Sequence, residues 1–167
     1  MKRTSFIMGS LVLSFVIALC LASLPDVAWA CQGGPPPDCG PTAWTAGESS
    51  WYVSDNWNAG VPSNCKTARV DNAGTSMIAS NRAKAKALEI GVTVAGSGTV
   101  TLSPGAELRV DAREFVGLGG FGEFLQVGGS HFVSCGTLTI AEDASSYGNY
   151  YLDDGLLSVK NADVAKQ

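Results

Sequence analysis

The sequence predicts an all-β fold, a short β-solenoid in which successive coils stack on one another. Six short runs each place two apolar side chains two residues apart, on one face of a strand. These runs lie at 68–70, 88–90, 108–110, 125–127, 138–140 and 157–159. Their leucines, at 88, 108, 125, 138 and 157, recur at uneven steps, which indicates a degenerate repeat with one run in each coil. Glycines, among them Gly105 and Gly155, precede several runs, where tight corners need positive φ.

Stacking is favoured because one such unit carries too little apolar surface to be stable alone. Successive coils bury one another's leucines and valines in a continuous core. An antiparallel β-sandwich is the alternative architecture, since it also shows short strands at this spacing.

The N-terminus has the pattern of a secretory signal. Lys2 and Arg3 precede an apolar run from Phe6 to Ala22, Pro25 breaks the run, and Ala28-Trp29-Ala30 supplies an A-x-A site. Residues 1–30 are therefore predicted to be a signal peptide that is cleaved after Ala30. An uncleaved anchor is the alternative, because the run approaches the length of a membrane span.

Cleavage would place Cys31 at the new N-terminus, where a lipid could be attached. A lipid attachment site would have a leucine-like residue three positions earlier, but Ala28 stands there. A small-residue cleavage site explains the same residues.

The mature chain, residues 31–167, is long enough for one modest domain. Removing Lys2, Arg3 and Asp26 from the 11 basic and 15 acidic residues leaves 9 and 14, a net charge of −5, without a long basic cluster. Nucleic acid is therefore not an expected partner. We expect no membrane span after signal cleavage.

Four cysteines remain in the mature chain: Cys31, Cys39, Cys65 and Cys135. An even number in an exported chain predicts two disulfides, with three connectivities open. A structural metal site is not expected, because there is no C-x2-C pair and His131 is the single histidine. No cofactor is expected either.

The mature chain divides into three parts. Residues 31–43 form a leader rich in proline, glycine and cysteine, which is compatible with neither a helix nor a central strand. Residues 44–160 form the solenoid domain, with an aromatic cap at 44–66, and residues 161–167 form a tail. Within the domain, residues 80–89 have helix-forming composition, but alanines alternate with basic residues at a period of two. That alternation predicts a strand running directly into Leu88.

Three segments, 51–62, 68–74 and 88–91, carry a resemblance to a known family. Their order resembles the opening module of large bacterial surface proteins with autotransporter-type β-strand repeats. In that family W-x-NW-x-x-G-x-P leads into a right-handed parallel β-helix. The resemblance covers residues 44–160 and implies a cell-surface solenoid acting in adhesion or as a stalk, with no catalytic residues. Because this chain is shorter and shows no anchoring segment after Val159, we expect neither self-transport nor permanent attachment.

The glycines at 117–122 match G-x-G-x-x-G, and Glu142-Asp143 lies about twenty residues further on. A dinucleotide site also needs a helix after the glycines, whereas the next residues have a strand pattern. Calcium binding of the G-G-x-G-x-D type is not expected, because Phe124 stands at the ligand position. A loop is the interpretation we favour.

Neither adjacent carboxylate pair, Glu142-Asp143 or Asp153-Asp154, is predicted to be a catalytic dyad. Neighbouring residues on a strand point to opposite faces, and both pairs lie beside turn signals. His131 has no nucleophile signature beside it, so we expect a solvent-facing histidine. Cys135 is expected to pair with another cysteine.

Trp44, Trp51 and Trp57 are the candidate binding residues. Exposed indole faces can stack against sugar rings or anchor a partner. In the resembling family they close the first coil, and a solenoid requires such terminal caps. We favour the hydrophobic plug over the binding site.

The sequence leaves two hypotheses about function. The first is an exported, non-enzymatic solenoid module with a structural or adhesive role at the cell surface. The second is a carbohydrate-binding module or a reduced polysaccharide-degrading β-helix, in which Trp51 and Trp57 stack sugar and Asp111, Glu114 or Arg113 serves a cleft. Expected partners are surface polysaccharides or other surface proteins. An uncapped C-terminal coil would also allow a homo-oligomer through its strand edges.

Overall fold

The computed structural model describes residues 37–164. The signal peptide, its cleavage site and lipidation at Cys31 lie outside the described residues. Thirteen β-strands and one short 3-10 helix, Ser54–Asn56, make up this part of the chain. No helix in residues 37–164 has the length and apolarity to cross a membrane. The strands β1 to β13 are, in order, Pro41–Ala43, Glu48–Ser50, Thr67–Val70, Thr75–Ile78, Arg82–Ala85, Ala87–Ile90, Ser97–Leu102, Glu107–Val110, Glu114–Val116, Phe121–Gln126, Ser130–Ile140, Tyr147–Leu152 and Leu156–Val164.

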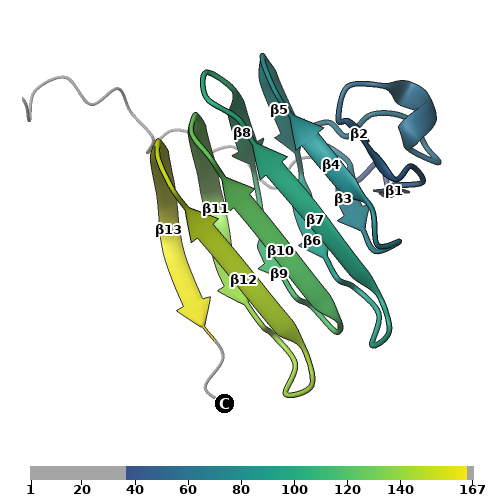
Figure 1. Ribbon diagram of the computed structural model, residues 1–167, viewed down its shortest axis with the longest axis vertical. Helices are drawn as coiled ribbons and strands as arrows, with labels where there is room; N and C mark the ends of the chain where they lie inside the picture. The colour runs from purple at the N-terminus through teal and green to yellow at the C-terminus, as the bar shows by residue number, and fades with distance from the viewer. Residues whose placement is uncertain (1–36, 165–167) are drawn as a thin grey trace, which may run out of the picture.

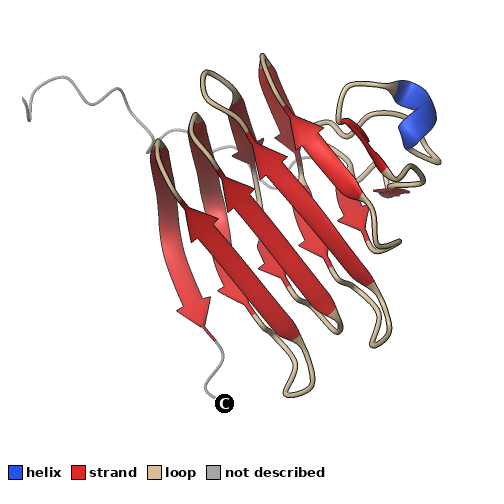
Figure 2. Cartoon of the chain, viewed as in Figure 1, coloured by secondary structure: helices blue, strands red, loops and turns tan. Residues whose placement is uncertain are grey.

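These strands form a parallel β-solenoid of about five turns. One sheet has the order β2-β4-β7-β10-β12. The other sheet bends around a corner, because the first part of β11 pairs with β8 and its last part pairs with β9. The chain therefore winds around three faces, with its coils stacked side by side in Figures 1 and 2. Every pairing between these strands is parallel, which excludes the antiparallel sandwich.

The register between coils differs from the predicted leucine repeat. The prediction that one leucine stacks on the next in the following coil was wrong, because successive leucines lie on different faces of the solenoid. Leu88, for example, lies between Ala68 and Glu114 rather than beside Leu108. Residues at equivalent positions in successive coils are therefore set by where the chain turns its corners, and not by the spacing of the leucines.

The inward side of most strands was predicted correctly, but β10 is the exception. Leu125 is half-buried and Val127 is 45% exposed, whereas Phe124 and Gln126 point inward. Gly122 sets this alternation, since a Cβ there would overlap the backbone nitrogen of Gly117. Only glycine fits that inward position, so every second residue after it also faces the core.

The strands differ from the predicted segments at three places. Strand β1 begins at Pro41, inside the predicted leader, where proline is tolerated as the first residue of an edge strand. Strand β13 extends to Val164, so residues 161–164 pair with β11 instead of forming a tail. The alternating segment at 80–89 is β-structure as predicted, but it is broken at Lys86 into β5 and β6, which lie on different faces.

A tryptophan plug closes the N-terminal end of the solenoid. Trp57 meets Trp44 and Trp51 edge to face, with ring centroids 5.0 and 4.9 Å apart. Its indole Nε1 donates to the Trp51 carbonyl at 2.8 Å, and the Trp44 Nε1 donates to the Gly47 carbonyl at 3.0 Å. The Trp51 Nε1 is buried without a hydrogen-bond partner, so apolar packing holds this ring in place. These contacts agree with the predicted plug.

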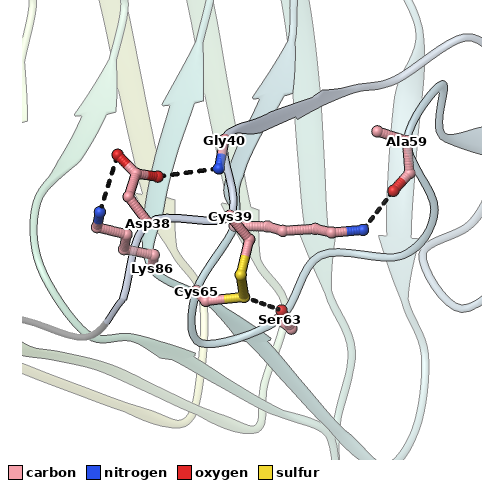
Figure 3. The surroundings of a disulfide bond; sticks show 8 residues. Asp38, Cys39, Gly40, Ala59, Ser63, Cys65 and Lys86 are labelled. Carbon is pink, nitrogen blue, oxygen red and sulfur yellow. Dashed lines mark hydrogen bonds and ion pairs between the residues drawn. A yellow bond between two sulfur atoms is a disulfide. The ribbon is translucent and has the colours of Figure 1, made fainter.

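A disulfide between Cys39 and Cys65 fastens β1 to the start of β3 (Figure 3). Beside it, Asp38 pairs with Lys86 at 3.2 Å and accepts the Gly40 amide at 3.0 Å. The Gly40 hydrogen bond, followed by the hydrogen bond and charge of Lys86, lowers the pKa of Asp38. Cys135 is also disulfide-bonded, whereas Cys31 lies outside the described residues.

Candidate functional site

The three tryptophans proposed as binding residues offer no face to a ligand. Their exposed fractions are 3% for Trp44, 0% for Trp51 and 3% for Trp57. A sugar or partner could stack on them only if the plug opened. The binding interpretation is therefore replaced by the structural one.

The proposed cleft of Asp111, Arg113 and Glu114 is not assembled either. Glu114 points into the core and is fully buried, while Arg113 is exposed and lies over the Phe115 ring, 5.4 Å from its centroid. Asp111 lies at the corner after β8. Burial raises the pKa of its carboxyl, and this effect outweighs the charges of Lys84 and Arg109, which lower it. Because one carboxylate faces the core and the other lies at a surface corner, they cannot act together on one substrate.

The glycine segment 117–122 is a corner between coils. The amides of Leu118, Gly119 and Gly120 all donate to the Gly91 carbonyl of the preceding coil, at 3.0, 3.0 and 2.9 Å. These amides are therefore occupied and cannot cradle a phosphate. The two adjacent carboxylate pairs likewise lie at turns, where Asp154 accepts the amide of Gly155 at 2.7 Å.

The C-terminal coil, formed by β12 and β13, has the character of an interaction surface. No strand among residues 37–164 covers its outer edge. Five large apolar side chains on it are strongly exposed: Tyr147 at 64%, Tyr151 at 49%, Leu152 at 49%, Leu156 at 51% and Val164 at 68%.

A cavity of about 410 Å³ also opens on this coil, between Phe121, Tyr147 and Val164. Large exposed apolar side chains gathered on one coil are typical of a contact site. The opposite end of the solenoid has its tryptophans buried, so the two ends differ in how much apolar side-chain surface they expose.

A buried polar cluster lies directly beneath this open coil. His131 Nε2 is 2.8 Å from Glu114 Oε2, and its Nδ1 is 2.8 Å from the Tyr150 hydroxyl. Tyr150 also lies 2.6 Å from Gln126 Oε1. The ring of Phe124 stacks on His131 and Tyr150, at 4.7 and 4.8 Å between centroids. The cluster therefore joins β9, β10 and β11 of one coil to β12 of the next.

The hydrogen bonds of the cluster determine where its protons lie. Gln126 Nε2 donates to the carbonyls of Gly129 and Leu156, so Oε1 must be the atom that faces Tyr150. Tyr150 donates its one proton to Oε1, so its oxygen must accept from Nδ1–H of His131. The other ring nitrogen of His131, Nε2, then faces Glu114 Oε2.

The protein environment keeps Tyr150 protonated. Burial, and then the charge of Glu114, raises the pKa of the Tyr150 hydroxyl above its ordinary value. Glu114 and His131 contact through the ion-pair distance alone, because Nε2 and both carboxylate oxygens lack a hydrogen bond of ordinary geometry. Glu114, Gln126 and His131 are buried, whereas Tyr150 is half-buried in the last coil.

The expectation of a solvent-facing His131 was wrong. A signal was present in the sequence: His131 stands two residues before Val133, so a strand places both on one face. Both are buried, with exposed fractions of 0% and 1%. Within residues 37–164, no group of three or more histidine, cysteine or acidic side chains could hold a metal ion.

Comparisons with known proteins add no identity to this geometry. No model of a protein family matches the chain, and no curated protein or solved structure does.

Proposed function

We propose that this chain is an exported, non-enzymatic β-solenoid module with a structural or adhesive role at the cell surface. The observation that carries the proposal is the asymmetry of its two ends. Tryptophans and a disulfide close the N-terminal end, while the C-terminal coil presents exposed aromatic and aliphatic side chains. A closed end and an adhesive end suit a module that is held by contact with another surface.

Disulfides support the exported location. They persist in oxidising compartments and are rare in the reducing cytosol. Cys39, Cys65 and Cys135 are all bonded, so none of the three is a free thiol.

The occupant we propose for the open end is a second copy of the chain. The plugged end has its tryptophans buried, whereas the same open end of another copy offers matching strand edges and matching apolar side chains. Two such ends can meet about a two-fold axis, which gives a closed, isologous dimer. Covering Tyr151 and Leu156 removes apolar surface from water and so stabilises the pair.

Sedimentation velocity on the secreted protein, over a dilution series, tests this proposal. We expect a concentration-dependent dimer for the unaltered chain, and a monomer at all concentrations for Tyr151→Lys and Leu156→Lys. Val94→Lys is the matched control, since Val94 is 80% exposed but lies at a corner away from the open end. A chain that is monomeric throughout, or a control variant that dissociates as readily, would overturn the proposal.

The polysaccharide-degrading alternative loses support for its cleft, because Glu114 faces the core while Asp111 lies at a surface corner. The carbohydrate-binding alternative fits a surface other than the tryptophans, the basic side chains of β3, β5 and β8.

A further inference from the structure

The described residues separate their charges strongly between faces. Six of the eight basic residues lie on β3, β5 and β8 or at the corners that lead into β6 and β9, and we call them the basic band. The basic band consists of Arg69, Arg82, Lys84, Lys86, Arg109 and Arg113. Apart from Glu114, whose side chain faces the core, four acidic residues lie with the basic band, which gives it a net charge of +2: Asp38, Glu89, Glu107 and Asp111. The rest of residues 37–164 has two basic and ten acidic residues, a net charge of −8.

The acidic partners in the basic band lie beneath its cations. Glu89 is shared by Arg69 at 2.7 Å and Arg113 at 3.8 Å, and only 4% of its side chain is exposed, against 43% and 63% for the arginines. Glu107 is shared in the same way by Arg82 and Arg109, and it is 23% exposed against 55% and 42%. Each carboxylate therefore neutralises one of two positive charges from the less exposed side, and the two guanidinium groups remain exposed to solvent.

The pairing holds Glu107 in its charged form. Burial raises the pKa of this carboxyl, but hydrogen bonds and charge from Arg109 and Arg82 outweigh burial and lower it. Each arginine is thus held by a carboxylate, and the rest of its N–H donors remain available on a side chain that is 42–63% exposed.

Aromatic rings continue the cationic rows. On one face Lys84 pairs in register with Arg109, and Arg109 with Phe132, whose ring centroid lies 4.9 Å from the guanidinium carbon. Neighbouring coils place these side chains at steps of about 4.8 Å. At the end of the row, beside the plug, a cavity of about 190 Å³ is lined by Tyr52, Arg82 and Lys84 among others.

We propose that the basic band binds an acidic polysaccharide, a polymer of sugars that carry carboxylate or sulfate groups. The inference rests on the proposed surface role and deepens it by naming a partner, but it uses a different face from the open end. Arginine forks match carboxylate geometry through paired N–H donors. The rings of Phe132 and Tyr52 provide apolar faces of the kind that pack against sugar rings.

Two other anionic partners fit the basic band less well. Nucleic acid affinity rises with the number of phosphates that cations neutralise, and a net charge of +2 beside a strongly acidic remainder neutralises few. Membrane binding needs apolar side chains that enter the interface. None of the strongly exposed large apolar residues in the described part lies on β3, β5, β6, β8 or β9.

Binding to immobilised polygalacturonate and dextran sulfate, with neutral dextran as the reference, tests the proposal. We expect the secreted protein to bind at least one acidic polymer and not neutral dextran, with affinity that falls as salt rises. Lys84→Gln/Arg109→Gln should weaken binding at least tenfold, while Arg82 still neutralises Glu107. Lys66→Gln/Lys160→Gln is the matched control, since it removes the two described cations outside the basic band, and it should bind within twofold of the unaltered chain.

Other outcomes would overturn the proposal. These are equal binding to neutral dextran, tighter binding to duplex DNA or to anionic vesicles at the same salt, or an equal loss in the control variant. Circular dichroism establishes that each variant is folded. Leu156→Lys tests the two proposals separately, because it should dissociate the dimer and still bind the acidic polymer. Lys84→Gln/Arg109→Gln should show the reverse, a dimer that has lost polymer binding. A failure to bind the acidic polymer by a chain that still dimerises affects this inference alone.

Discussion

Glu114 and His131 lie 2.8 Å apart in the interior of the solenoid, with both side chains fully shielded from water. Each stands in a column of leucines: Leu88 and Leu138 flank Glu114, and Leu108 and Leu157 flank His131. No other charged side chain among the described residues pairs with either of them. The two residues therefore stand where a solenoid built for stability alone would place two more leucines.

Replacing one member of this pair should cost more than replacing both. His131→Leu leaves a buried carboxyl without its partner, and we expect a loss of about 3–5 kcal/mol. Glu114→Leu leaves an imidazole that can remain neutral with one unpaired nitrogen, so its cost should be about 1–3 kcal/mol. The double variant completes both leucine columns and should lie within about 1.5 kcal/mol of the original protein. Urea unfolding of all four proteins measures the cycle, and additive losses in the double variant would contradict it.

Tyr150 should make the stability fall at alkaline pH. Burial raises its pKa in the folded chain, so the folded state retains a proton that the unfolded chain releases near pH 10. A raised pKa contributes stability below the unfolded value, and this contribution is lost as the pH rises above about 10. Urea midpoints between about pH 8.5 and 11 should fall more steeply for the original protein than for Tyr150→Phe. Tyr151→Phe is the control at an exposed neighbour, and parallel curves for all three proteins would refute the assignment.

The Cys39–Cys65 disulfide should stabilise the first coil by limiting the unfolded chain. The two cysteines have a sequence separation of 26, for which loop-closure entropy gives about 3–4 kcal/mol. Cys39→Ser/Cys65→Ser should lose that amount in urea unfolding under non-reducing conditions. A loss below about 1 kcal/mol would show that the packing of β1 on β3 alone holds the coil.

The second disulfide follows from counting cysteines. Cys39 and Cys65 bond to each other and Cys135 is bonded, so a chain cleaved after Ala30 has only Cys31 left as the partner of Cys135. Non-reducing peptide mapping of the secreted protein should recover Cys31 joined to Cys135, with Cys31 as the unmodified N-terminal residue. A lipid on Cys31, a bond to Cys20 or a free Cys31 thiol would each contradict this prediction.

Local pattern was sufficient to identify the fold and the inward side of several strands. Leu88 and Ile90, and Leu108 and Val110, are fully buried as their spacing predicted. The same reasoning failed at Leu125 and Val127, because a period of two does not say which of its two faces is the core. The close approach of Gly122 to the Gly117 backbone decides that question, and such an approach exists only in the folded chain.

The buried cluster was beyond prediction from local pattern. Glu114 and His131 are distant in the sequence, and they meet because the corners between β9, β10 and β11 return the chain to the same coil. The basic band shows the same dependence. Lys84 and Arg109 become neighbours through the register of β5 on β8, which depends on corner lengths and not on any repeat of residue types.

The sequence by itself determined an all-β chain that must stack its coils, a tryptophan cluster that caps it, and cysteines suited to oxidation. These properties arise from side-chain alternation, turn chemistry and composition, which act over a few residues. The tertiary structure alone decided which residues become neighbours in adjacent coils. That choice depends on the lengths of the corners and on the space available in the core, and so places Glu114 against His131 and arranges the arginines on two neighbouring faces of the solenoid.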